Sequence, residues 1–136
     1  MPRAPMIIAL DFDGTVVTQD FPEVGREIQA VPWLRKIQNS YNVSFILNTM
    51  RSGETLKEAE KWFERNKINL YGVNVNPDQK DWTTSPKLYA HLYVDDKSLG
   101  SPTVIPDGFL SSKPYIDWSL AGPAIVDILE EGGYRK

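Results

Sequence analysis

A ten-residue stretch near the start of the chain, residues 6–15, reads MIIALDFDGT. Its first five residues form a continuous apolar run, which is typical of a parallel strand buried on both faces. Its second half places two aspartates one residue apart, and Gly14 permits the backbone to turn directly behind them. The stretch therefore predicts a buried strand at Met6–Leu10 that ends in a pair of carboxylates.

Short apolar runs alternate with stretches of helical period along the rest of the chain. This alternation favours βαβ units and a mainly parallel sheet covered by helices. Further strands are expected at residues 43–47, 71–75 and 92–94, with residues 103–105 as a fifth. The pattern predicts an α/β fold of Rossmann-like type with three layers, helices on both sides of the sheet.

Three helices are expected between and after these strands. The first begins near Pro32, because a fixed φ suits the first helical position, and the second runs over Gly53–Arg65 with Ser52 as its N-cap. The third helix is expected to begin at Pro123. The side chains expected to face the core are Leu34, Ile37, Tyr41, Leu56, Ala59, Phe63, Ile125, Ile128 and Leu129.

Composition restricts the class of protein. The 136 residues suffice for one domain, residues 1–136, and are too few for two ordinary ones. With 15 basic and 18 acidic residues the formal charge is −3, and no basic run favours broad binding to nucleic acid. Cysteine is absent, which excludes disulfides and thiolate metal sites, and no apolar run is long enough for export or anchoring. We therefore expect a cytoplasmic protein with no membrane or disulfide partner.

Polar features follow the predicted strands at their carboxyl ends, where open α/β sheets bind ligands. After the first strand, Asp11 could attack phosphorus to form an aspartyl-phosphate. Asp13 could protonate the leaving alkoxide and later take a proton from water. An ordinary acidic turn is the alternative, because Asp and Gly are common turn residues.

The loop after the second strand carries Thr49, Met50 and Arg51. A hydroxyl and main-chain N–H groups at a helix N-terminus make a natural phosphate contact, and Thr49 is the candidate for it. Arg51 could reach a second phosphate or carboxylate of a substrate, as arginine forks do. Alternatively, Thr49 only ends a strand, Ser52 only caps a helix, and Arg51 pairs with a surface acid.

The segment that precedes the fourth strand holds two further candidate residues, Lys87 and Trp82. Lys87 could neutralise both the nucleophile and the transferred phosphoryl group, although most lysines are simply solvated. Trp82 is the candidate for stacking on a substrate, with packing under a loop as the alternative.

Asp95 and Asp96 come directly after the fourth strand. Neighbouring carboxylates repel each other unless a cation lies between them, and hard oxygen ligands of this kind suit Mg²⁺. A simple turn is the alternative, but it leaves unexplained why two strands end in paired acids.

At these residues the chain resembles the haloacid dehalogenase (HAD) superfamily of phosphohydrolases. Residues 11–15, DFDGT, look like its first motif, Thr49 like the second, Lys87 like the third, and Asp95-Asp96 like the fourth, in the order of that family. The resemblance covers about residues 7–99. It implies catalytic roles for Asp11, Asp13, Thr49 and Lys87. It also implies an Mg²⁺ ion held by the Asp11 carboxylate, the Asp13 main-chain carbonyl and an acid of the fourth motif, with Asp95 as direct ligand and Asp96 supporting it.

Members of the family carry a cap domain at one of two insertion points. Here the intervals 11–49 and 49–87 each span 38 positions and each already holds a helix and a strand, so no cap domain fits. An open site implies a bulky substrate, or cover from a loop or a second copy of the chain. The segments that could supply local cover are residues 18–27, 76–86 and 109–118, the last including Phe109.

The sequence therefore predicts an Mg²⁺-dependent hydrolase of phosphomonoesters that acts through an aspartyl-phosphate on Asp11. Its substrate is a phosphorylated small molecule, or a nucleotide or terminal phosphate on nucleic acid. A receiver-like phospho-acceptor is one alternative, but its phosphorylated aspartate would follow the third strand, where no acid occurs before Asp78. A non-catalytic binding module with the same fold is the other, and the complete set of acids argues against it.

Overall fold

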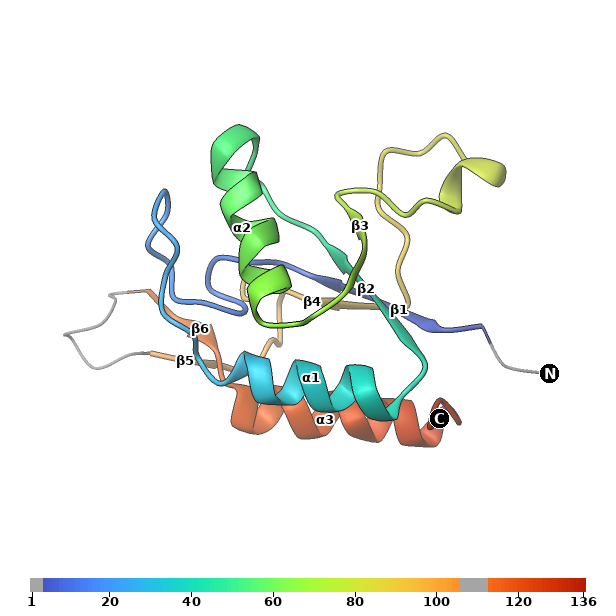
Figure 1. The fold of residues 1–136 in the computed structure, drawn as a ribbon. Coiled ribbons are helices and arrows are strands. Elements are labelled where there is room, and N and C mark those ends of the chain that lie inside the picture. Colours follow the sequence, from blue (N-terminus) through green and yellow to red (C-terminus); the bar gives the residue numbers. More distant parts are fainter. Residues whose placement is uncertain (1–3, 106–112) are drawn as a thin grey trace.

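The structure is a computed structural model, and it describes residues 4–105 and 113–136. A sheet of four strands in the order β3-β2-β1-β4 lies at its centre (Figure 1). The strands are β1 (Met6–Leu10), β2 (Val43–Leu47), β3 (Leu70–Val73) and β4 (Leu92–Val94). All neighbouring pairs are parallel, so the carboxyl ends of the four strands meet at one edge of the sheet.

Three helices pack against one face of this sheet. They are α1 (Ala30–Ser40), α2 (Gly53–Arg65) and α3 (Trp118–Glu131), and α1 and α3 run side by side (Figure 1). Ile8 and Leu10 of β1 belong to the same buried cluster as the helices, because alternate residues of a strand point to opposite faces. The helix residues buried in that cluster are Ala30, Leu34, Ile37, Ala59, Trp62, Phe63, Trp118, Ala121, Ile125 and Leu129.

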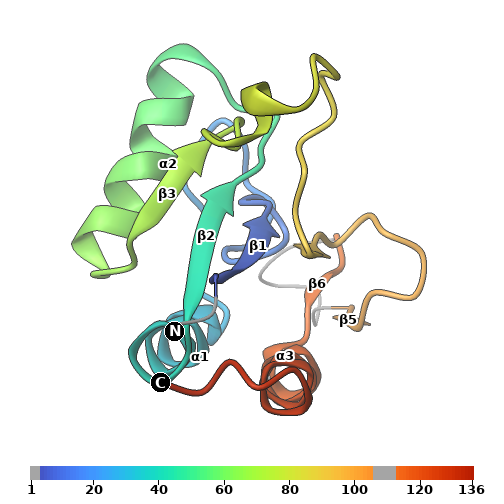
Figure 2. The same cartoon turned by 90° about the vertical axis from the view of Figure 1, so that its right-hand side faces the viewer.

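The opposite face of the sheet is covered by the segment between β3 and β4. Ala9 and Ile46 pack there against Leu88 and Ala90. This segment contains the short 3-10 helix η1 (Gln79–Asp81) and lies on the side of the sheet away from α1 and α3 (Figure 2). The α/β class, the parallel sheet and the three layers are confirmed, although the third layer is mainly irregular chain rather than helix. The described residues contain no cap domain.

The strands β1, β2 and β4 and the helix α2 have the predicted bounds, whereas α1 begins at Ala30, two residues before Pro32, and β3 covers Leu70–Val73 instead of residues 71–75. The helix α3 begins at Trp118, five residues before Pro123, because the Asp117 carboxylate accepts hydrogen bonds from the Ser119 N–H at 3.0 Å and the Ser119 hydroxyl at 2.6 Å. The prediction that Pro123 opens this helix was therefore wrong, and so was the prediction that Ile128 is buried, since 41% of it is exposed.

Residues 103–105 do not extend the central sheet. Instead β5 (Thr103–Val104) pairs antiparallel with β6 (Tyr115–Ile116) in a separate two-stranded sheet. The Ile116 N–H donates to the Gly14 carbonyl at 2.9 Å, so this small sheet is joined to the loop that follows β1. None of the helices that the structure describes is both long and apolar enough to cross a membrane.

Candidate metal centre and active site

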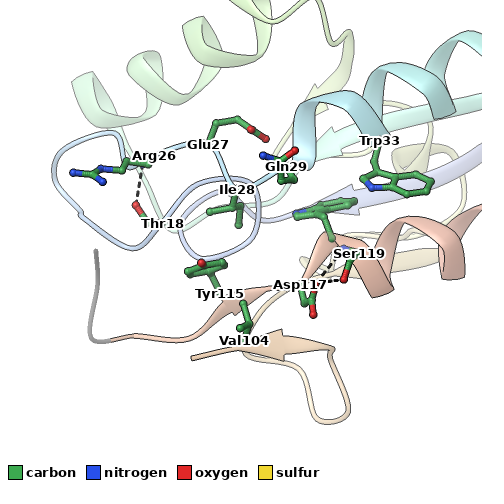
Figure 3. A pocket seen from close by; sticks show the side chains of 11 residues that line it. Thr18, Arg26, Glu27, Ile28, Gln29, Trp33, Val104, Tyr115, Asp117 and Ser119 are labelled. Atoms are coloured by element: carbon green, nitrogen blue, oxygen red, sulfur yellow. Dashed lines mark hydrogen bonds between the residues drawn. The ribbon is translucent and has the colours of Figure 1, made fainter. Parts of the chain in front are cut away.

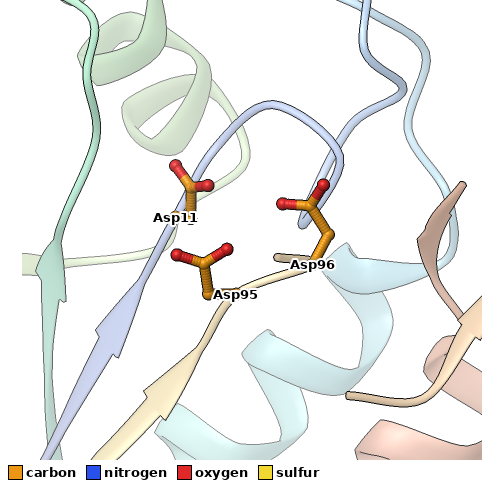
Figure 4. A group of neighbouring side chains, drawn as sticks. All are labelled: Asp11, Asp95 and Asp96. Atoms are coloured by element: carbon orange, nitrogen blue, oxygen red, sulfur yellow. The ribbon is translucent and has the colours of Figure 1, made fainter. Parts of the chain in front are cut away.

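The predicted acids of two distant segments meet at the carboxyl edge of the sheet. Leu10 and Val94 are partners in the register of β1 and β4, and the Asp11 N–H donates to the Val94 carbonyl at 3.0 Å. The next residues along both strands are acids, so they come side by side. Carboxylate oxygens of Asp11, Asp95 and Asp96 lie within 4.8 Å of one another (Figure 4). We call these three residues the acid cluster.

Electrostatics make the acid cluster unfavourable by itself. The pKa of Asp11 is raised from 3.8 to about 7, chiefly by burial; the Phe12 N–H, 2.7 Å from Asp11 Oδ1, opposes the rise, and the carboxylates of Asp95, Asp96 and Asp13 add to it. The pKa of Asp96 is also raised, first by burial and then by Asp95. A divalent cation among these oxygens would offset the repulsion, and three carboxylates are the hard donor set that Mg²⁺ prefers. The residues present therefore fit such an ion.

Asp96 is held in place by residues of the loop that follows β1. Thr15 Oγ1 donates to Asp96 Oδ1 at 3.3 Å and accepts from the Asp96 N–H at 3.2 Å, and Gln19 Nε2 donates to Asp96 Oδ2 at 2.8 Å. Gly14 has φ +76°, and a Cβ at this position would lie 2.5 Å from Asp96 Oδ2. Gln19 could not be predicted as a partner of Asp96, because nothing in the local sequence marks a contact 77 positions away.

Asp13 stands outside the acid cluster and pairs with Arg51 instead. Arg51 Nε donates to Asp13 Oδ2 and Nη2 to Asp13 Oδ1, both at 2.8 Å, and only 1% of the Arg51 side chain is exposed. We expected Arg51 to reach a substrate. The structure places it against Asp13, with its guanidinium enclosed by protein. The Asp13 main-chain carbonyl as a metal ligand stays a prediction.

The loop after β2 is ordered by its own hydrogen bonds. The Thr49 N–H donates to Asn74 Oδ1 at 2.8 Å, and the Thr49 hydroxyl accepts from the Arg51 N–H at 3.1 Å. The Thr49 side chain is half-buried. Met50 is 99% exposed and points away from the protein body. Thr49 is thus fixed at the carboxyl edge, whereas Met50 can contribute only apolar surface.

Lys87 and Trp82 lie together in the segment between β3 and β4. Both line a cleft of about 240 Å³ with Tyr89 and Tyr93. Trp82 is 64% exposed and stands edge-on to Tyr89 with 5.4 Å between ring centroids. Lys87 is exposed, and within the described residues its ammonium makes no ion pair. The structure therefore does not bring Lys87 into contact with Asp11.

A larger cavity of about 590 Å³ lies elsewhere, beside the start of α1 (Figure 3). Its walls include Thr18, Arg26, Trp33 and Tyr115, and no member of the acid cluster. Of the segment 109–118 expected to give cover, Phe109 lies outside the described residues. At its other end Trp118 is buried in the core, and its Nε1 donates to the Thr15 carbonyl at 2.7 Å.

Comparison with known proteins gives one informative match. No family model matches the chain, and no curated protein matches it at a significant level. A solved structure, described as that of the conserved protein coded by locus from Bacteroides thetaiotaomicron, is 33% identical, with a TM-score of 0.72. The match covers 91% of this chain and 92% of that one. At this identity and coverage, the chain belongs to the same family as that conserved Bacteroides thetaiotaomicron protein.

Proposed function

We propose that this chain is an Mg²⁺-dependent phosphomonoester hydrolase of the HAD type, with Asp11 as its nucleophile. The observation that carries the proposal is the acid cluster: three carboxylates from the ends of two adjacent parallel strands, with oxygens within 4.8 Å of one another. The order of the four motifs along the chain supports the same reading. The three acids belong to the first and fourth motifs, and the order of the motifs adds Thr49 and Lys87 to the set.

Asp11, Asp95 and Asp96 would hold the ion, with the Asp13 carbonyl as a further ligand. A bound Mg²⁺ would neutralise the carboxylates and draw negative charge from the phosphoryl oxygens. The ionised form of Asp11, which is the nucleophile, is the form that such an ion favours.

The reaction runs in two steps. An Asp11 carboxylate oxygen forms a bond to phosphorus while the bond from phosphorus to the alkoxide breaks, and Asp13 gives that alkoxide a proton. A water then attacks the phosphorus of the aspartyl-phosphate and gives a proton to Asp13. The bond from phosphorus to Asp11 breaks, inorganic phosphate leaves, and both aspartates return to their starting states.

Substrate contacts are assigned to Thr49, Lys87 and Trp82. The Thr49 hydroxyl would contact the phosphoryl group, and the exposed Lys87 would swing its ammonium toward it. The substrate is a phosphorylated small molecule, or a nucleotide or nucleic-acid end whose base stacks on Trp82. Cover of the open site by a loop or a second copy of the chain stays a prediction.

Purified protein with Mg²⁺ and p-nitrophenyl phosphate tests the proposal. Asp11→Asn should abolish turnover, with a loss of at least about 10³-fold, because no other group replaces the nucleophile. Asp127→Asn, an exposed acid on α3, is the matched control and should keep full activity. Turnover that survives Asp11→Asn would remove Asp11 from the mechanism.

A divalent-ion-binding module without turnover is the second candidate. It is favoured by the absence of contact, within the described residues, between Lys87 and the acid cluster. Such a module would bind Mg²⁺ but hydrolyse nothing in a broad panel of phosphate esters. A long-lived phosphoryl group on Asp11 after treatment with acetyl phosphate would instead indicate a receiver-like phospho-acceptor.

A further inference from the structure

The side chain of Arg51 is enclosed and all of its donors are used. Two of its N–H groups go to the two oxygens of Asp13 at 2.8 Å each. The others donate to main-chain carbonyls: Nη2 to Glu23 at 2.7 Å, and Nη1 to Pro22 at 3.3 Å and Thr55 at 3.2 Å. A guanidinium has five N–H donors, so this set leaves none for a substrate.

Two aromatic rings complete the enclosure. The Arg51 Cζ lies 4.9 Å from the ring centroid of Phe12 and 5.2 Å from that of Phe21. Phe12 is fully buried, whereas Phe21 is 61% exposed and stands between the guanidinium and solvent. Burying a charge is costly unless it is paired and hydrogen-bonded, and here both conditions are met.

The partners of Arg51 come from three separate parts of the chain. Asp13 follows β1, Pro22 and Glu23 belong to the loop that leads to α1, and Thr55 lies in the first turn of α2. Arg51 itself follows β2. One side chain therefore ties together the loops around the carboxyl edge, and its planar fork sets the plane of the Asp13 carboxylate.

We propose that Arg51 is a positioning residue that orients Asp13 for proton transfer to the leaving group, an inference that rests on the proposed hydrolase function. The bidentate pair fixes rotation of the Asp13 carboxylate and leaves each oxygen a second lone pair that is available to the leaving group. When Asp13 gives its proton to the alkoxide, the guanidinium stabilises the carboxylate that remains.

A positioning role, a substrate-binding role and a purely structural role for Arg51 predict different changes in kcat and KM. Proton transfer matters most for a poor leaving group, and little for p-nitrophenolate, which leaves without a proton. Loss of the fork should therefore affect an alkyl phosphate more than p-nitrophenyl phosphate. A substrate-binding arginine would instead change KM for both esters, and a purely structural one would lower kcat for both equally.

The test compares kcat and KM of Arg51→Lys and Arg51→Gln on p-nitrophenyl phosphate and on glycerol phosphate with Mg²⁺. General acid–base catalysis contributes about 10²–10⁴-fold, so we expect kcat on glycerol phosphate to fall about 100-fold and on p-nitrophenyl phosphate less than about 10-fold, with KM little changed. The control is Arg65→Gln, an exposed arginine of α2, which should change neither rate. Equal losses on the two esters, or a rise in KM alone, would overturn the proposal.

A double-mutant cycle with Asp13→Asn gives an independent readout. If Arg51 acts through Asp13, adding Arg51→Gln to Asp13→Asn should cost no further activity. An additive loss would overturn the proposal.

If neither Arg51 variant folds, Phe21→Ala removes only an exposed ring from the guanidinium and should shift the ratio of the two rates in the same direction. An unchanged ratio in that variant counts against the role of Arg51. Wild-type protein that hydrolyses neither ester would contradict the proposed function as well, whereas active wild type with unchanged ratios contradicts the inference alone.

Discussion

Asp11→Asn should stabilise the metal-free protein at pH 8. In the folded state the pKa of Asp11 is raised to about 7, chiefly by burial, against 3.8 for an ordinary aspartate. This gap of about 3 pH units corresponds to about 4 kcal/mol at about 1.36 kcal/mol per unit. Asparagine carries no charge and its Oδ1 can still accept the Phe12 N–H. Because the side chain is only partly buried, we expect a gain of about 2–4 kcal/mol.

The sign of the pH dependence follows from the raised pKa. Below pH 3.8 Asp11 is protonated in both states, and the wild type bears no cost. Between pH 3.8 and about 7 the unfolded chain ionises while the folded chain keeps its proton, so wild-type stability falls as the pH rises. The advantage of Asp11→Asn should therefore be largest at pH 8 and less than about half as large at pH 5.

Urea unfolding with EDTA, followed by far-UV circular dichroism at pH 5 and pH 8, measures this difference. Asp127→Asn is the control and should change stability little at either pH. Mg²⁺ should raise the stability of the wild type at pH 8 by mass action and that of Asp11→Asn much less. An Asp11→Asn variant that is no more stable than the wild type at pH 8 in EDTA would refute the electrostatic argument.

Three further predictions concern the turn beside Asp96, the start of α3 and the exposed Trp82. Gly14→Ala forces a Cβ to 2.5 Å from Asp96 Oδ2 at a residue with φ +76°, so it should lower stability by at least about 1 kcal/mol and weaken Mg²⁺ binding, measured by urea unfolding and calorimetry. Unaltered Mg²⁺ affinity would contradict the close fit of this turn to Asp96. Asp117→Ala removes the N-cap of α3 and should cost about 0.5–2 kcal/mol in urea unfolding without changing turnover. Trp82→Ala should raise KM for a nucleoside monophosphate about 10-fold if a base stacks there, because such stacking contributes about 1–3 kcal/mol, and leave KM for a sugar phosphate unchanged. Equal effects on both substrates would discard base stacking.

The central sheet was predictable because its strands are buried on both faces. Such strands show as unbroken apolar runs, and β1, β2 and β4 have the bounds that these runs gave. The start of α3 is marked by Asp117, which is followed by Ser119 and forms the N-cap, and not by Pro123, which lies inside the helix. The pairing partner of β5 could not be predicted, because a strand of two residues is too short to show a hydrophobic pattern.

The candidate site was predictable only in part. The acids could be placed because each directly follows a strand, and the ends of parallel strands share one edge. The role of Arg51 could not, because a buried arginine and a substrate-binding arginine look alike in sequence, and its partner Asp13 lies 38 positions away. The contact of Gln19 with Asp96 could not be predicted either, because the two residues lie 77 positions apart. The position of Lys87 depends on an irregular segment, whose path has no periodicity from which it could be read.

The central claim is that Asp11, supported by a divalent ion at the acid cluster, accepts the phosphoryl group. Its most direct test is to quench the protein during turnover of a phosphate ester with Mg²⁺, reduce acyl phosphates with borohydride, and map the modified residue by mass spectrometry. We predict homoserine at position 11, dependent on Mg²⁺ and greatly reduced in Asp95→Asn. Turnover with no modification at position 11, or with the modification at another residue, would contradict the account.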